Sequence, residues 1–61
     1  MNILVSSISS STGEVIKSFD ADFDKYFKVN SELSNAAKVV ASGFEWEGSE
    51  SFGTYLRIKA S

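Results

Sequence analysis

Carboxylates are the side chains whose spacing first suggests chemistry in this sequence. Asp20, Asp22 and Asp24 alternate in DADFDKYFKVNS, as the first ligands of a calcium-binding loop do. The later positions do not fit such a loop, because Lys25 replaces the glycine of the sharp turn and Ser31 replaces the glutamate that completes the ligand shell. We therefore expect an acidic turn and no metal site.

Glu45 and Glu47 form a second acidic pair in SGFEWEGSESFG, residues 42–53. Two carboxylates catalyse a reaction only when a shaped pocket holds them, and 61 residues offer little material for one. The sequence contains neither histidine nor cysteine, which excludes imidazole catalysis, thiolate metal sites and disulfides. Its four glycines are scattered, so no phosphate-binding loop is predicted. We expect a protein that is not an enzyme and uses no cofactor.

Size and composition indicate one small folded domain over residues 1–61. Hydrophobic residues make up 43% of the chain, unlike a disordered tail, and no apolar run approaches the roughly 20 residues of a membrane-spanning helix. The first residues lack the basic start of a signal peptide, so we expect a cytoplasmic protein. Eight acidic and six basic residues give a formal charge of −2, a mild acidic excess.

Three segments read as strands. The β-branched and apolar residues of NILVSSI, 2–8, predict the first, and EVIKSF, 14–19, runs back beside it after the turn signal SSSTG. Near the end of the chain, FGTYLRIK, 52–59, alternates apolar and polar residues as a half-buried strand does.

The segment 19–29 fits two interpretations. KYFKV alternates as a strand does, whereas the aromatic spacing fits one helix face: Phe19, Phe23, Tyr26 and Phe27. Aspartate is a poor helix-interior residue and a good turn residue. We therefore expect a turn at Asp20–Asp24 and a strand over Lys25–Val29.

One helix is predicted between Ser31 and Gly43. Ser31 is a good N-cap, and Gly43 is placed to end the helix in a Schellman motif that brings Phe44 against Val39. Between these ends, apolar residues recur at helical spacing: Leu33, Ala36, Ala37, Val40 and Ala41.

The predicted order is strand, strand, strand, helix, strand. This is an α+β fold in which a small antiparallel sheet of three to four strands carries one helix on one face. We expect the helix to pack on Leu4, Ile16, Phe27, Val29, Leu56 and Ile58. Free sheet edges and an uncovered face permit a monomer or a weak dimer.

The second sheet face is predicted to be basic and aromatic. It would hold Tyr26, Lys28, Tyr55, Arg57 and Lys59, with Lys17 close by. Tyrosines that stack on bases, set between cations that meet phosphates, are how a sheet binds single-stranded nucleic acid. The alternative is an ordinary exposed strand face, which the acidic composition of the chain favours.

The loop before the last strand also has two interpretations. In one, Phe44 and Phe52 anchor the loop to the core and Trp46 covers the helix end. In the other, Trp46 forms an aromatic and carboxylate patch that binds a basic protein surface, together with Glu45, Glu47 and Glu50. In strict alternation, Phe44 and Trp46 would face one way while Glu45 and Glu47 face the other.

Two segments, SELSNAAKVVAS and GTYLRIK, resemble a group of small phage proteins. They are similar to the LS-x-A…AS helix opening and the GT-x-x-RI strand of that group, which includes one of the anti-CRISPR inhibitors of type I-F surveillance complexes. The resemblance runs from Ser31 to Lys59. The similar helix has a basic residue at the position of Lys38, while Val39 stands where a second basic residue would be expected.

The resemblance implies a function for the whole chain. It implies an antiparallel sheet with one helix, and a viral inhibitor that occupies the nucleic-acid-binding surface of a CRISPR complex in the host cytoplasm. Lys38 would then face solvent and the partner. An acidic protein is steered electrostatically toward such a basic surface, which makes a protein partner the first expectation and direct nucleic-acid binding the second.

Overall fold

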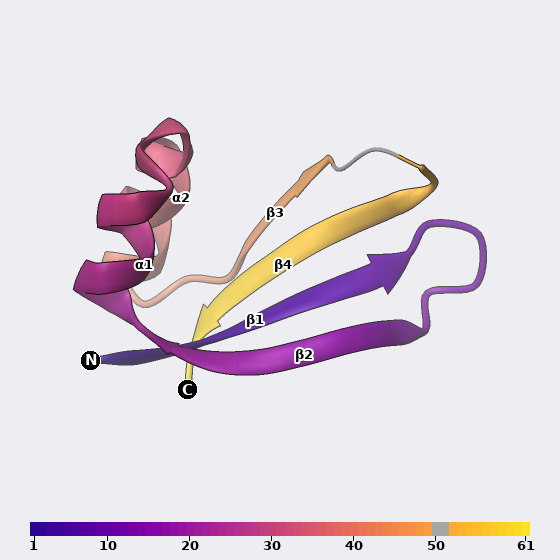
Figure 1. Cartoon of the computed structure of the whole chain (residues 1–61), viewed down its shortest axis with the longest axis horizontal. Helices are drawn as coiled ribbons and strands as arrows, with labels where there is room; N and C mark the ends of the chain where they lie inside the picture. Colours follow the sequence, from indigo (N-terminus) through magenta and orange to yellow (C-terminus); the bar gives the residue numbers. More distant parts are fainter. Residues whose placement is uncertain (50–51) are drawn as a thin grey trace.

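The sheet is antiparallel throughout, and its strands lie in the order β2-β1-β4-β3 (Figure 1). The computed structural model describes residues 1–49 and 52–61. In chain order the elements are β1 (Asn2–Ser9), β2 (Val15–Asp22), α1 (Phe23–Val29), a 3-10 turn η1 (Ser31–Leu33), α2 (Ser34–Ala41), β3 (Trp46–Ser49) and β4 (Thr54–Ala60). The predicted α+β class is confirmed, but the order of elements differs from the prediction.

The β1–β2 hairpin is present where the sequence predicts it, and β2 runs three residues further than expected. Ser7 pairs with Lys17 while Ile8 pairs with Val15, so Ile16 is an additional residue in a β-bulge. Ile16 was expected in the core but is 61% exposed, because it lies in a bulge on an edge strand.

The predicted turn at Asp20–Asp24 and strand at Lys25–Val29 are wrong, because α1 begins at Phe23. The Asp22 carboxylate accepts a hydrogen bond from the Lys25 backbone N–H at 3.0 Å, so an aspartate taken for a turn residue caps a helix. Phe23 and Phe27, four residues apart, meet edge to face at 4.9 Å. The helical spacing of the aromatic residues was therefore the informative pattern.

The second helix starts later than predicted and ends where predicted. Ser31 lies inside η1 and is not the N-cap of α2. At the other end, Gly43 adopts φ +89° and donates to Val40 O at 3.0 Å, and Phe44 donates to Val39 O at 3.2 Å. These two bonds form the expected Schellman motif.

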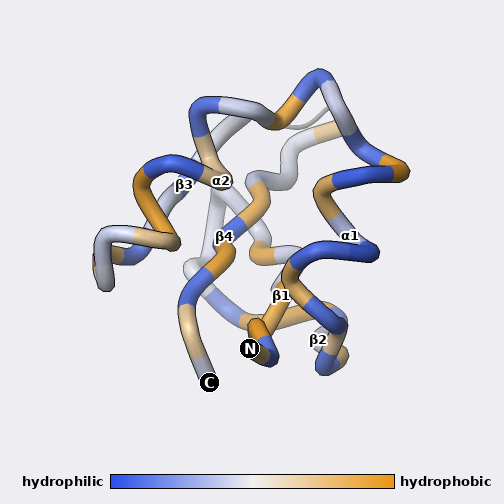
Figure 2. Tube along the Cα trace, turned by 90° about the vertical axis from the view of Figure 1, so that its left-hand side faces the viewer, coloured by the Kyte–Doolittle hydropathy of each residue, from blue (hydrophilic) through white to orange (hydrophobic). Residues whose placement is uncertain are grey.

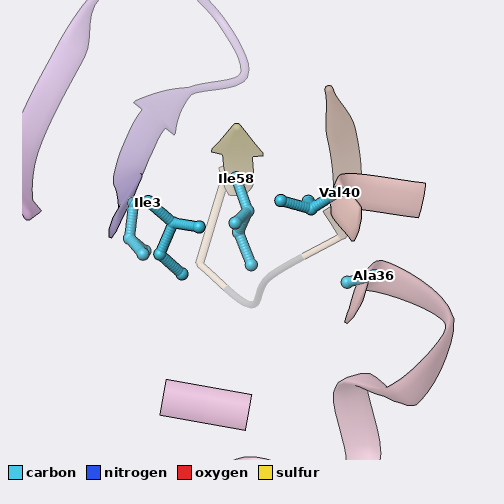
Figure 3. Close-up of a cluster of buried hydrophobic side chains, with 5 residues drawn as sticks. Ile3, Ala36, Val40 and Ile58 are labelled. Atoms are coloured by element: carbon cyan, nitrogen blue, oxygen red, sulfur yellow. The ribbon is translucent and has the colours of Figure 1, made fainter. Parts of the chain in front are cut away.

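The core lies between the sheet and α2 (Figure 3). Its buried members are Ile3, Val5, Ala36, Val40 and Ile58, and half-buried residues around them include Phe27 and Leu56. Leu4 was expected here, but Ile3 and Val5 occupy the helix-covered face of β1, so Leu4 lies on the opposite face. Val29 was also expected here and is 76% exposed on α1. Ile58, Leu56 and Phe27 are confirmed.

The loop predicted before the last strand contains a strand. Trp46–Ser49 forms β3, which pairs with β4 so that Trp46 lies opposite Ile58. Phe52 was expected to begin β4 on the core face, but β4 begins at Thr54. Phe52 is fully exposed with φ +63°.

The helices cover one end of the sheet, beside the two chain ends, while the β1–β2 turn and the start of β4 lie at the other end (Figure 1). The backbone N–H of Ser10 donates to Gly53 O at 2.8 Å and so ties the two hairpin ends together. Hydrophilic and hydrophobic residues alternate along β4, as a strand with one covered face requires (Figure 2). We call the side that carries α1 and α2 the helix face and the other side the open face.

Candidate functional site

Arg57 is the centre of a charged cluster on the open face. Its position in β4 is directly opposite Glu47 in β3, which fixes the two side chains on the same face. The Arg57 Nε atom lies 2.8 Å from Glu45 Oε1, and its Nη2 atom lies 3.1 Å from Glu47 Oε2. Nε also donates to Glu47 Oε2 at 3.2 Å. One guanidinium is therefore engaged by two carboxylates.

The two glutamates stabilise the positive charge of Arg57 and balance it. The hydrogen bond with Glu47 raises the pKa of Arg57, partial desolvation opposes it, and the charges of Glu45 and Glu47 raise it further. Arg57 therefore remains cationic across the physiological range. Its charge is balanced by the two glutamates, so it presents little positive potential to an anionic ligand.

Tyr55 and Lys59 share the open face with Arg57, as the alternation of β4 predicts. The Tyr55 hydroxyl accepts a long hydrogen bond, 3.5 Å, from Arg57 Nη2. A shallow depression beside the cluster is lined by Glu47, Gly48, Ser49 and Tyr55.

Three members of the predicted basic and aromatic face lie elsewhere. Tyr26 and Lys28 belong to α1 and not to a strand, so they cannot continue the open face. Lys17 pairs with Ser7, two residues from the buried Val5, so it lies on the helix face. The structure brings together Tyr55, Arg57 and Lys59 and separates Tyr26, Lys28 and Lys17 from them.

Trp46 lies on the opposite face of the sheet from the two glutamates that flank it. It is half-buried against the core, and its indole lies across Gly48, where an added Cβ would come within 2.6 Å of the Trp46 Cζ2 atom. The predicted alternation of Trp46 with Glu45 and Glu47 is confirmed. Trp46 therefore contributes to packing, while the carboxylates of Glu45 and Glu47 bind Arg57.

The sequence reasoning missed an aromatic cleft on the helix face. The cleft measures ≈ 340 Å³, and its apolar lining residues are Val5, Phe19, Tyr26, Leu33, Trp46 and Leu56. Lys17 places its ammonium 5.9 Å from the Phe19 ring centroid, and the Phe19 and Tyr26 rings lie 6.3 Å apart. Phe19 lies in β2, Tyr26 in α1 and Trp46 in β3, so these rings come together only in the tertiary structure and no local spacing predicts the cleft.

The remaining predicted site residues are dispersed. Lys38 is exposed on α2, as expected, and Glu50 lies outside the described residues. Asp20 and Asp22 lie in β2, and Asp24 lies in the first turn of α1. Within residues 1–49 and 52–61, no three acidic side chains are grouped as metal ligands would be.

In the described part of the chain, neither helix has the length and apolar character needed to cross a membrane. Comparison with known proteins adds no relative: no protein-family model, curated protein or solved structure matches this chain. The site must therefore be interpreted from its own geometry.

Proposed function

We propose that this chain is a non-enzymatic inhibitor that binds a host nucleic-acid-handling complex, of which a CRISPR surveillance complex is the first candidate. In this proposal the protein blocks the surface that the complex uses to hold nucleic acid. The proposal rests on the sequence resemblance to small phage inhibitors and on one structural observation, the engagement of Arg57 by Glu45 and Glu47.

The Arg57 cluster favours a protein partner over direct nucleic-acid binding. A sheet that binds single strands needs free cations beside its aromatic residues. Here the central cation is neutralised by two carboxylates, and the outer strand β2 adds Asp20 to the same face. The open face thus carries more acidic than basic side chains, which opposes contact with phosphates.

An acidic surface is suited to a partner that normally binds nucleic acid. Such partners expose lysine and arginine, and complementary charge accelerates and orients their association with an acidic protein. The formal charge of −2 is small, so the arrangement of the acids on β2 and around Arg57 matters more than their total.

The proposal is tested with a bacterium that carries an active type I-F CRISPR system. Expression of the protein should restore plaque formation by a targeted phage, and the purified protein should prevent the surveillance complex from shifting its target DNA in a gel. A phage that the system does not target is the control, because its plaque count should not change. Full immunity together with unimpaired DNA binding by the complex would contradict the proposal.

A gel shift with the protein alone separates the two functions. We expect no shift of single-stranded or double-stranded DNA at moderate salt, because Arg57 is neutralised. A robust shift that Tyr55→Ala abolishes would favour the nucleic-acid-binding function. The double variant Glu45→Gln with Glu47→Gln is informative here, since it releases Arg57 and should increase any weak DNA binding.

A further inference from the structure

The outer edge of β2 has backbone groups that no neighbouring strand uses. β2 is the end strand of the sheet, and the Phe23 N–H donates to Met1 O at 2.9 Å across the hairpin. Antiparallel hydrogen-bonded pairs recur at every second residue, so Ala21 and Phe19 are the β2 residues that bond β1. The backbone N–H and C=O groups of Ser18 and Asp20 therefore point away from the sheet.

The two faces of this edge differ in chemistry. On the open face, Asp20 is exposed, while Asp22 at the end of the strand turns its carboxylate to the first turn of α1. On the helix face, β2 and α1 form a groove of ≈ 450 Å³ with Ala21, Tyr26 and Val29 on its walls and Asp22, Lys25 and Asn30 beside them. Phe19, which is 43% exposed, extends the apolar side along the strand. The edge therefore has the Asp20 carboxylate on one side and a groove with apolar walls on the other.

A second copy of this chain is a poor occupant of the edge. Antiparallel pairing of β2 with itself about a two-fold axis places open face beside open face, so the aspartates of one copy approach those of the other. Like charges across neighbouring strands are destabilising. A basic segment from a different protein satisfies the same backbone groups without this repulsion.

We infer that the β2 edge binds an extended basic segment of the partner protein as a fifth, antiparallel strand. Every second residue of that segment is lysine or arginine and lies on the same side as Asp20, and the residues between them are apolar and enter the groove beside α1. This inference rests on the proposed function, because it assigns the part of a nucleic-acid-handling partner that the inhibitor holds.

Short synthetic peptides test the inference with the intact protein. A peptide that alternates lysine with valine or leucine should bind, with NMR amide shift changes confined to β2 and α1. A peptide with the same residues in separate basic and apolar blocks should bind at least about tenfold more weakly, because only alternation places each type on its own face. Equal binding of the two peptides would overturn the inference.

Backbone methylation separates strand addition from simple charge attraction. Lysines opposite Asp20 form hydrogen-bonded pairs with β2, so methylating their amide nitrogens should weaken binding at least about tenfold. Methylating the valine or leucine amides, which point away from β2, should leave binding nearly unchanged. Loss of binding in both peptides, or in neither, would contradict strand addition.

Reversing the charge of Asp20 tests whether this side chain contributes to peptide binding at the β2 edge. Asp20→Lys should weaken the alternating peptide at least about tenfold, whereas Glu14→Lys, the same charge change just before β2, should weaken it less than about threefold. Circular dichroism of both variants checks that they fold. Equal weakening by both substitutions would mean that only net charge matters and would overturn the inference.

The phage assay distinguishes this inference from the proposed function. If wild type and Asp20→Lys inhibit the CRISPR system equally, the edge inference fails and the proposed function stands. If the alternating peptide binds as described but wild type does not inhibit, the proposed function fails and the strand-binding edge stands.

Discussion

Gly48 and Trp46 fit against each other on the helix face of β3, and this pair determines how the last hairpin packs. A side chain at Gly48 would overlap the indole, which is itself held against the core. Trp46 packs against the core, and its binding to a partner stays a prediction.

We predict that Gly48→Ala lowers the free energy of unfolding by about 1–3 kcal/mol, because the indole must leave its place. Urea denaturation measures the loss, and Ser49→Ala, an exposed neighbour, should change stability by less than about 0.5 kcal/mol. In a Trp46→Leu background the Gly48→Ala cost should fall sharply. An equal cost in both backgrounds would show that the indole is not the obstacle.

Phe52, unlike Trp46, is not packed against the core: its side chain is fully exposed and its backbone is left-handed. Phe52→Asn should raise the free energy of unfolding by up to about 1 kcal/mol, because asparagine tolerates φ +63° and no buried surface is lost. Phe52→Val should lower it, since β-branched residues tolerate this region poorly. Thermal denaturation of both variants measures the difference, and equal destabilisation by both would contradict the assignment.

At the scale of elements, one capping hydrogen bond explains why the segment after β2 forms the helix α1 and not a turn. The run Asp20–Asp24 was interpreted as a turn, but β2 continues to Asp22, whose side chain then caps α1. The same aspartate ends a strand and begins a helix with no connecting loop between them.

We predict that Asp22→Ala lowers the free energy of unfolding by about 1 kcal/mol and reduces the helical signal in circular dichroism. Asp22→Asn should retain most of the stability, because asparagine is also a good N-cap. Asp24→Ala removes the same charge two residues later without removing the cap and should cost less. If Asp22→Ala and Asp24→Ala behave alike, charge and not capping stabilises the helix start.

At the scale of the whole molecule, the central strand β1 is the most deeply buried strand of the sheet. β1 lies between β2 and β4, and its residues Ile3, Val5 and Ile8 are almost fully buried. The outer strand β2 is exposed along nearly its whole length, and the helices cover only one face. A chain of this size buries only about 60% of the surface that its unfolded form exposes, so its margin of stability is small.

We predict that amide hydrogen exchange rates alternate between odd-numbered and even-numbered residues of β1. The Ser61 N–H donates to Asn2 O, which places the even residues of β1 in bonds to β4 and the odd residues in bonds to β2. The edge strand β2 should open first, so the amides of Ile3 and Val5 should exchange faster than those of Leu4 and Ser6. NMR exchange rates measure this order, and uniform protection along β1 would indicate that the sheet opens as one unit.

Local patterns determined several parts of this fold. The first hairpin, the alternation of β4 and the glycine stop of α2 follow from neighbouring residues alone, because turns, strands and helix caps depend on short-range geometry. The spacing of Glu45, Trp46 and Glu47 likewise placed the acids opposite the indole. The sequence also contained the helical aromatic spacing of α1, but the aspartates around it favoured the wrong alternative.

Tertiary structure decided the features that bear on function. The face of β1 that enters the core was ambiguous, because Ile3, Leu4 and Val5 are all apolar and only pairing with neighbours selects a face. Arg57 was predicted on a basic strand face, and Glu45 and Glu47 were predicted in an acidic loop. The structure brings these three residues into contact because β3 pairs with β4, which no local pattern indicated. The acidic edge likewise exists because strand order leaves β2 outermost. Sequence determines which side chains are available, but long-range pairing determines which of them meet.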